Sequence, residues 1–193
     1  MGIIKDQLIE HIERNLPSSL QKHIYRSCEV GRVLCKIHDV DTEKVEIALL
    51  GHDLYRAYSD IDMLSAAEEK EIEISNIEKD SPLLLHGVLA SIKMQEQYKV
   101  SDKQIIESIK YHTSGMEEMD EVFMTVFLAD KLDPKKIEKN TQLDPINQTS
   151  LSSLEDATLM YLNLTISSII NSDHLVHPDS LDARNSLLLK TRI

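Results

Sequence analysis

Four histidines and two aspartates occupy positions where predicted helices turn their side chains towards the core. The clearest case is the doublet His52-Asp53, because Val45 and Leu49 precede His52 at the spacings of one helix face. A carboxylate at the edge of such a buried face is costly without a partner. A metal ion is a partner that an imidazole and a carboxylate can share. The other members of the set are His23, His86, His112 and Asp130.

Imidazoles and carboxylates without thiolates favour borderline or hard metals such as Fe, Mn, Co or Zn. Six such ligands suffice for two metal ions about 3.5–4 Å apart, if one carboxylate bridges them. Metal pairs of this kind hydrolyse phosphate esters and anhydrides, because they activate water and stabilise charge on the attacked phosphorus. A single buried histidine is more often a core residue bonded to a carbonyl. The prediction of a metal site therefore depends on all six residues together. Polar residues at several core-facing positions break the usual helix pattern, and such exceptions tend to occur together at functional sites.

The remaining histidines carry no predicted chemistry. His38-Asp39 is a second His-Asp doublet, but it lies at a predicted helix end in polar sequence, so we interpret it as a solvated helix terminus. His11, His174 and His177 lie near a terminus or in turn-like sequence.

The composition is typical of a helical globular domain. The chain has 193 residues, 41% of them apolar, and only 5 Gly and 5 Pro, which argues against a turn-rich β architecture. The net charge is −12 and no Lys/Arg cluster occurs, so nucleic acid and anionic membranes are poor candidate partners. No signal peptide or 18-residue apolar span is visible, and we expect a cytoplasmic location.

The two cysteines support the same compartment. Cys28 and Cys35 are seven residues apart on one predicted helix, a rise of about 10.5 Å, which exceeds the reach of a disulfide. Their spacing also matches no zinc motif. We therefore expect two buried free thiols in a reducing cytoplasm.

The elements that position the six residues are all predicted to be helices. No period-two alternation or hairpin signal appears, so the predicted fold class is all-α, a single-domain helical bundle with the metal site between helices. The metal-binding core should span about 17–140, with C-terminal helices at about 150–190 packing on it. The predicted helices span residues 3–15, 17–37, 42–59, 60–70, 82–94, 101–112, 122–132, 154–171 and 178–189, the last of them short. Asp41 or Thr42 is the predicted cap of the third helix, and Asp60 that of the fourth.

Several boundaries follow from single residues. Ser101 and Gln104 form a predicted capping box, and Asp133-Pro134 stops the helix of Asp130. The acidic run after residue 70 is interpreted as solvated surface, and 145–153 as a polar loop.

The ordered set resembles the H…HD…H…H…D pattern of the HD-domain phosphohydrolases. Within that superfamily, the sequence is most similar to the bacterial symmetrical diadenosine tetraphosphate hydrolases. The resemblance spans roughly residues 20 to 189. The motifs that carry it, besides the ligand set, are Leu84-Leu85-His86-Gly87, Tyr111-His112-Thr113-Ser114-Gly115, Leu128-Ala129-Asp130-Lys131-Leu132-Asp133-Pro134, His177-Pro178-Asp179-Ser180 and Ala183-Arg184-Asn185.

This resemblance implies two metals, commonly iron, and cleavage of diadenosine tetraphosphate into two ADP. It assigns one metal to His23, His52, Asp53 and Asp130, and the other to His86, His112 and the bridging Asp53. Arg56 stands where the family usually has a lysine and can bind phosphate through its planar fork, so Asp53 and Arg56 are the expected catalytic residues.

Further substrate contacts are open to two interpretations. Arg26 and Lys131 either bind phosphate or act as surface and ion-pair charges. The turn Thr113-Ser114-Gly115 either gives backbone N–H groups to a phosphate or only ends a helix. Leu20, Asp133 and Lys135 depart from the pattern of the branch, and we expect these differences to leave the metal ligands untouched.

Three other functions remain as alternatives. The chain could be an HD-domain hydrolase of a mononucleotide, a nucleotide-binding regulator without turnover, or a helical interaction module with satisfied core histidines. The complete ligand set favours an enzyme over the last two, because lost chemistry usually shows as a missing ligand. A nucleotide is the expected partner, and a homodimer is left open.

Overall fold

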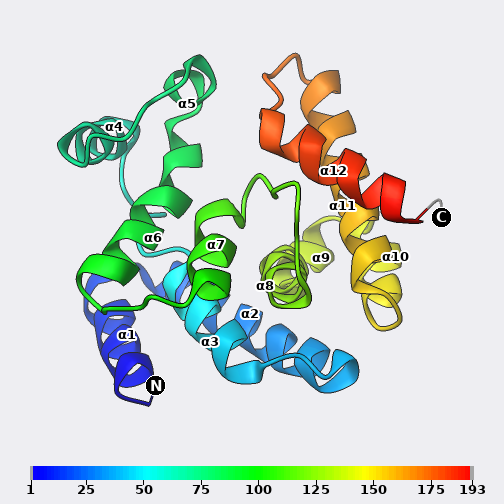
Figure 1. The fold of residues 1–193 in the computed structure, drawn as a ribbon, viewed down its shortest axis with the longest axis horizontal. Helices are drawn as coiled ribbons and strands as arrows, with labels where there is room; N and C mark the ends of the chain where they lie inside the picture. Colours follow the sequence, from blue (N-terminus) through cyan, green and yellow to red (C-terminus); the bar gives the residue numbers. More distant parts are fainter. Residues whose placement is uncertain (1, 192–193) are drawn as a thin grey trace.

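The fold is built from helices joined by turns and short loops (Figure 1). The computed structural model describes residues 2–191, and within that range it contains no β-strand, which confirms the all-α prediction. The helices are α1 (Gly2–Asn15), α2 (Ser18–His38), α3 (Thr42–Gly51), α4 (Asp60–Glu69), α5 (Asn76–Asp80), a 3-10 turn η1 (Pro82–Leu84), α6 (Leu85–Glu96), α7 (Lys103–Tyr111), α8 (Glu121–Lys131), α9 (Pro134–Lys139), α10 (Leu143–Ser150), α11 (Leu154–Asn171) and α12 (Pro178–Thr191).

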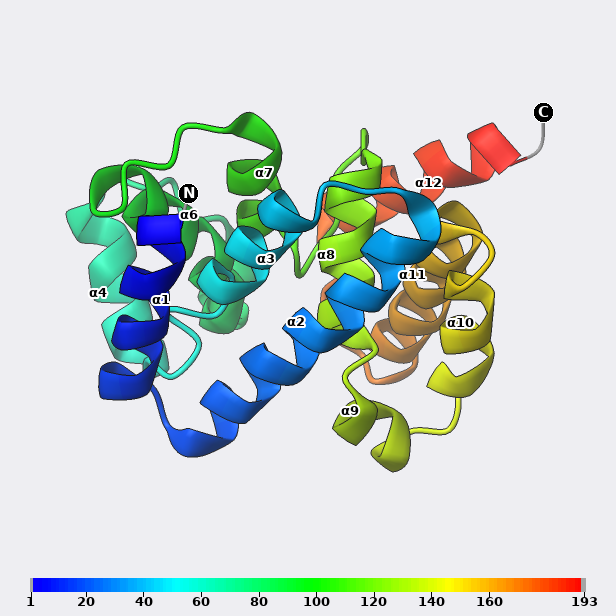
Figure 2. The ribbon, with the colours of Figure 1, turned by 90° about the horizontal axis from the view of Figure 1, so that it is seen from below.

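The long helix α2 runs diagonally across the molecule and packs on both α3 and α8 (Figure 2). Its inner face includes Ile24, Leu34 and the two free cysteines, which are buried as predicted. Close packing is possible at Gly31, where an added Cβ would lie 2.6 Å from the Leu49 side chain. Helix α2 therefore holds His23 directly against the elements that carry the other ligands.

Helix α8 is the centre of the bundle. All residues from Val122 to Lys131 are buried, on every side of the helix. A helix that is hydrophobic all round belongs inside a protein. Helices α2, α3, α7 and α11 pack around it, and its C-terminal end carries Asp130 into the middle of the fold.

The C-terminal helices α10, α11 and α12 form a group at one end of the molecule (Figure 1). The prediction of a loop at 145–153 was wrong, because α10 occupies Leu143–Ser150. Pro145 stands in the first turn, where no backbone N–H is needed, and Leu143, Ile146 and Ser150 bury one helix face. The polar residues that suggested a loop are the outer face of this helix.

Other helix boundaries also differ from the predicted ones. Ser59 rather than Asp60 caps α4, and Asp102 caps α7 through the N–H groups of Gln104 and Ile105, so the capping box at Ser101 was wrong. The acidic run after residue 70, predicted as solvated surface, contains the short helix α5 with a capping box of its own. Helix α8 ends before Asp133-Pro134 as predicted, but a further helix, α9, begins there. The last helix, predicted to be short, has 14 residues.

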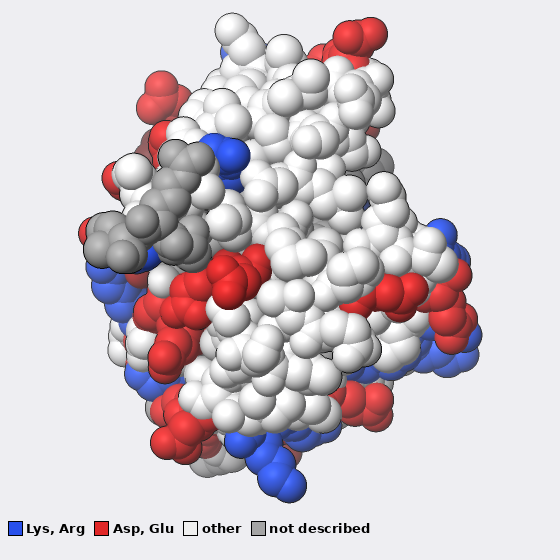
Figure 3. Space-filling model, turned by 90° about the vertical axis from the view of Figure 1, so that its right-hand side faces the viewer, with Lys and Arg blue, Asp and Glu red and all other residues white. Residues whose placement is uncertain are grey.

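The surface over the C-terminal helices carries few charges for so acidic a chain. Figure 3 shows a broad uncharged area on this side of the molecule, with one run of acidic groups reaching towards its middle and further acidic and basic groups around it. Among the described helices, none is both long and apolar enough for a membrane span.

Candidate metal centre

Three of the predicted ligand histidines share one local geometry. In each, the ring Nδ1 donates a hydrogen bond to the backbone carbonyl three residues earlier, so the neutral ring keeps its lone pair on Nε2. The donor–carbonyl pairs are His52 to Leu49 at 2.7 Å, His112 to Ile109 at 2.7 Å, and His86 to Leu83.

This geometry explains why the helix of His52 is shorter than predicted. Helix α3 ends at Gly51 rather than near Ser59, and turns follow. In a continuing helix, the N–H of Asp53 would donate to the Leu49 carbonyl. The His52 ring takes that carbonyl instead, and the chain turns so that Asp53 enters the same space as the ring.

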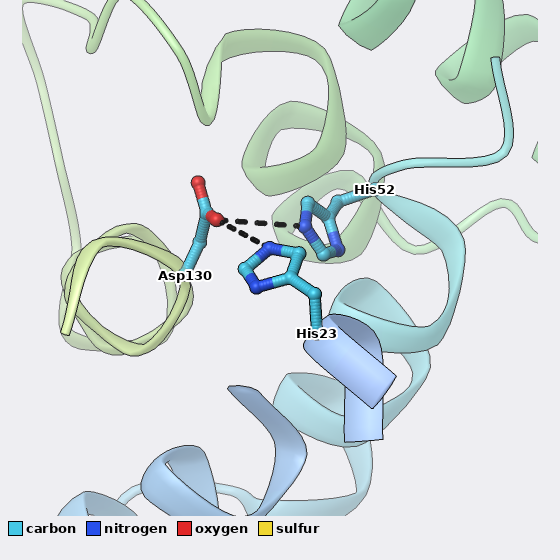
Figure 4. A group of neighbouring side chains, drawn as sticks. All are labelled: His23, His52 and Asp130. Carbon is cyan, nitrogen blue, oxygen red and sulfur yellow. Dashed lines mark hydrogen bonds and ion pairs between the residues drawn. The ribbon is translucent and has the colours of Figure 1, made fainter. Parts of the chain in front are cut away.

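His23 and His52 converge on one oxygen of Asp130. The Nε2 atom of His23 lies 2.9 Å from Asp130 Oδ1, and that of His52 lies 3.8 Å from the same oxygen. Figure 4 shows both rings, from α2 and from the end of α3, directed at this carboxylate on α8. These three side chains form one group that could hold a metal ion.

Asp53 lies between this group and the other two histidines. Its Oδ2 is 3.3 Å from His52 Nε2 and 3.7 Å from His23 Nε2. Its Oδ1 is 3.3 Å from His86 Nε2 and 3.7 Å from His112 Nε2. The two oxygens thus face two different pairs of imidazoles, which is the arrangement that a bridging carboxylate requires.

The nitrogen atoms fit a cation rather than a closed hydrogen-bond network. His86 Nε2 and His112 Nε2 are 2.9 Å apart, although both rings already donate through Nδ1. Two lone pairs at that distance need a cation or an extra proton between them. The Nε2 atom of His52 is buried and has no hydrogen-bond partner in the structure. A buried polar atom without a hydrogen-bond partner usually binds an ion or an ordered water molecule. The residues present therefore fit a metal centre.

The carboxylates of the cluster are ionised. Burial alone would raise the pKa of Asp53, but the charge of the His52 ring and the facing imidazoles of His112 and His86 hold that pKa well below its usual value. The pKa of Asp130 is likewise held down, against burial, by the charges of Lys131 and Lys136. The cluster therefore presents negative charge to a cation at neutral pH.

The imidazoles differ from one another. Burial and the neighbouring rings His86 and His52 lower the pKa of His112 to about 3, so this ring is neutral and able to ligate. Burial acts the same way on His52, but the carboxylates of Asp53 and Asp130 outweigh it and raise its pKa to about 10. A proton thus competes with a metal at the Nε2 atom of His52.

Asp133 is a site residue that the sequence analysis missed. Its Oδ2 accepts a hydrogen bond of 2.7 Å from His23 Nδ1, and both of its oxygens accept from Arg26, at 2.6 and 2.7 Å. The expectation that this position leaves the ligands untouched was therefore wrong. Asp133 also caps α9. In the sequence, Asp133 before Pro134 indicates only a helix boundary, so nothing there pointed to the contact with His23. Of the two interpretations offered for Arg26, its side chain takes the ion pair.

A cavity of about 480 Å³ opens over the cluster. Arg56 is exposed and lines it, as do Lys131, Thr113 and a second missed residue, Lys136. Lys131 Nζ donates to Asp130 Oδ2 at 2.5 Å, and Lys136 Nζ to Asp130 Oδ1 at 2.7 Å. Lysine ammonium groups and an arginine beside a candidate metal pair form a suitable surface for phosphates.

Two residues of the predicted phosphate-binding turn lie elsewhere. Ser114 and Gly115 do not line this cavity. Gly115 is buried at φ 81° and its N–H donates to the Tyr111 carbonyl at 2.8 Å, so that N–H is already used in the turn. His38, from the second His-Asp doublet, donates from Nε2 to the Ser150 carbonyl at 2.7 Å and lies outside the cluster.

Several known proteins are similar to this chain in sequence and in fold. The HD domain family model matches residues 20–135. A symmetrical bis(5'-nucleosyl)-tetraphosphatase of Staphylococcus aureus is 27% identical over 90% of this chain and 89% of its own. The enzyme of the same name from Bacillus subtilis is 23% identical over 97% and 95%. A crystal structure of a predicted HD superfamily hydrolase from Clostridium acetobutylicum superposes with a TM-score of 0.89, at 24% identity, covering 96% of this chain and 97% of the other.

Proposed function

The chain belongs to the HD domain family, and from that membership we propose that it hydrolyses dinucleoside tetraphosphates symmetrically, with diadenosine tetraphosphate as the leading substrate. The observation that carries the proposal is the position of Asp53, whose two oxygens face two separate pairs of imidazoles. The relatives named as symmetrical tetraphosphatases cover nearly the whole chain and support this substrate class.

The proposed cofactor is a pair of metal ions, with iron as the first candidate and Mn, Co or Zn as alternatives. His23, His52, Asp53 and Asp130 would hold one ion, and His86, His112 and Asp53 the other. When bound, such a pair lowers the pKa of a water molecule and offsets charge at the attacked phosphorus.

The reaction adds one water across the central P–O–P bond. The water oxygen stays on one phosphorus, the bridging oxygen leaves with the other, and two nucleoside diphosphates result. Arg56, Lys131 and Lys136 line the cavity where four phosphates would carry their charge, and each can donate to phosphate oxygens. Asp133 fixes the ring of His23 so that its Nε2 faces the cluster.

Two other functions stay as alternatives. A mononucleotide hydrolase of the same family would release phosphate and a nucleoside instead of two diphosphates. A regulator that binds nucleotides without turnover would keep the cavity, but its six ligands would serve no purpose. The proposed compartment is the cytoplasm, and two free buried thiols are compatible with a reducing environment.

Replacement of Asp53 by asparagine tests the proposal. We expect Asp53→Asn to keep the helical fold, because asparagine has nearly the same shape as aspartate and position 53 lies in the turn after α3. It should lose both metals and at least about 100-fold in turnover, because even residues outside the coordination shell cost about 10–100-fold. Asp39→Asn is the matched control, as Asp39 has φ 58° at the end of α2, a conformation that asparagine tolerates. An Asp53→Asn protein with full metal content and full activity would refute the proposal.

A further inference from the structure

A second cavity, of about 250 Å³, lies next to the metal cavity. Leu84 and Thr113 line both cavities. The other walls come from segment 72–78, from α6, from the end of α7 and from the start of α12. Figure 1 shows α5 and the start of α12 on either side of the space above α7. The volume lies just below the roughly 300–1,000 Å³ of complete ligand pockets, as suits one part of a larger substrate.

The two cavities differ in chemistry. The metal cavity contains Arg56, Lys131 and Lys136 beside the ligands, so it suits phosphates. The second cavity combines apolar walls with three carboxylates, which disfavour phosphate and accept hydrogen bonds from amino and hydroxyl groups. Its apolar walls include Ile72, Val88 and the ring of Tyr111, and its carboxylates belong to Glu73, Glu78 and Asp179.

The two basic side chains of the second cavity, Lys110 and His177, already have partners. Lys110 Nζ lies 4.7 Å from the centroid of the Tyr111 ring, within range of a cation–π interaction. His177 Nε2 lies 3.9 Å from Glu78 Oε1, and its Nδ1 accepts from the N–H of Asp179 at 3.2 Å. The net character is therefore that of a pocket for a base and a ribose.

Helix α12 links this cavity to the metal centre. Ser180 Oγ donates to the Ser114 carbonyl at 2.8 Å, and a Cβ on Gly115 would lie 2.9 Å from the Cβ of Ala183. The same turn begins at Thr113, whose hydroxyl is 3.3 Å from His112 Nε2. The HD domain match ends at residue 135, so α12 adds this wall from outside the matched region.

From this juxtaposition we infer that the second cavity binds one nucleoside of the dinucleoside tetraphosphate, while the central phosphates lie in the metal cavity. The inference builds on the proposed function. Symmetrical cleavage requires the metals to lie beside the middle of the bound substrate. The two nucleosides at its ends therefore extend from the metal centre in different directions. One passes Thr113 into the second cavity, and the other follows the remaining wall of the metal cavity beside Leu20 and Arg56.

Two variants change the second cavity and leave the lining of the metal cavity unaltered. Glu78→Gln removes a carboxylate but keeps the capping box of α5, because glutamine also accepts from the N–H of Ser75. Val88→Phe fills the space between the apolar walls. Asp80→Asn is the matched control, since Asp80 lies on the same short helix, is exposed and lines neither cavity.

The test compares two substrates of the metal-loaded protein. Diadenosine tetraphosphate has two nucleosides, whereas adenosine 5'-tetraphosphate has one and should give ADP and pyrophosphate. For the cavity variants, we expect kcat/KM to fall about tenfold for the first substrate, as for one or two lost hydrogen bonds. For adenosine 5'-tetraphosphate, kcat/KM should stay unchanged, because its single nucleoside can lie along the other wall of the metal cavity, beside Leu20 and Arg56.

An equal loss on both substrates, or a loss on neither, would overturn the inference. If the wild-type chain cleaves no dinucleoside tetraphosphate, the proposed function fails, and equilibrium dialysis with ADP tests the cavity separately. The metal-loaded wild type should then bind two ADP per chain and the Val88→Phe variant one. A single ADP in both proteins would refute the nucleoside cavity.

Discussion

Among single residues, the clustering of the candidate ligands could be predicted because these residues break the pattern of their own helices. A polar residue on an apolar face is visible in the sequence, and the structure brings His23, His52, Asp53 and Asp130 together. Asp133 could not be found in this way. It reaches His23 across 110 residues of sequence, and only the packing of α2 beside the start of α9 creates that contact.

Asp133 should act through the orientation of His23. Replacement by asparagine keeps the cap of α9 but removes the charge that holds the ring, so metal affinity should fall about 10–100-fold. Metal titration of the apoprotein followed by calorimetry measures this loss. Lys135→Gln, an exposed change two residues away, is the control. Wild-type affinity in Asp133→Asn would show that the contact does not support the site.

His112 should make the metal-free protein sensitive to acid. Its folded pKa is about 3, whereas an unfolded histidine titrates near 6.5. Between these values the unfolded chain binds one more proton at this residue, so the free energy of unfolding decreases as pH falls. Denaturant titrations of the apoprotein between pH 6.5 and 4.5 measure the slope, above the range in which Asp53 and Asp130 take up protons. His112→Gln should flatten it, and an unchanged slope would contradict this assignment.

At the scale of elements, most helices could be predicted, but several of their ends could not. Periodicity fixes the buried face of a helix, whereas its end depends on which group takes the last carbonyls. The end of α3 is set by the His52 ring, which takes the Leu49 carbonyl. Helix α10 was missed because Pro145 and polar residues resemble a loop until α11 packs on its buried face.

The contact between α6 and α7 should depend on Gly87. An added Cβ there would lie 2.6 Å from the Lys110 carbonyl oxygen and 3.0 Å from that of Ile109. Alanine would favour the helix by up to about 1 kcal/mol, but the clash is with backbone and cannot relax cheaply. We expect Gly87→Ala to cost about 1–3 kcal/mol of unfolding free energy.

The same substitution should also separate His86 from His112 and weaken the second metal. Denaturant unfolding together with metal analysis measures both effects. Gly2→Ala is the control, since no atom lies within 4 Å of its added Cβ. A Gly87→Ala protein with normal stability and two metals would show that this approach is not required.

At the scale of the whole molecule, the uncharged face over the C-terminal helices is a candidate for self-association (Figure 3). Two chains of net charge −12 repel each other least where their surfaces carry few charges. The exposed large apolar residues of these elements are Leu151, Ile170, Leu175, Leu181 and Leu189.

The sequence left the oligomeric state open, and from this face we now predict a homodimer. Sedimentation equilibrium should give twice the chain mass for the wild type and a monomer for Leu189→Asp, because a buried unpaired charge is costly. Ile61→Asp, at an exposed apolar residue on α4, is the control. A monomeric wild type at all concentrations would contradict the prediction.

The proposed reaction, cleavage of a dinucleoside tetraphosphate at its middle bond by metals held on six ligands, is tested by its products. Ion-exchange chromatography resolves the products that metal-loaded protein releases from diadenosine tetraphosphate. We expect two ADP per substrate consumed, with no ATP, AMP or phosphate, and no products from Asp53→Asn. Equal amounts of ATP and AMP, release of phosphate, or an intact substrate in the presence of fully metal-loaded protein would contradict the account.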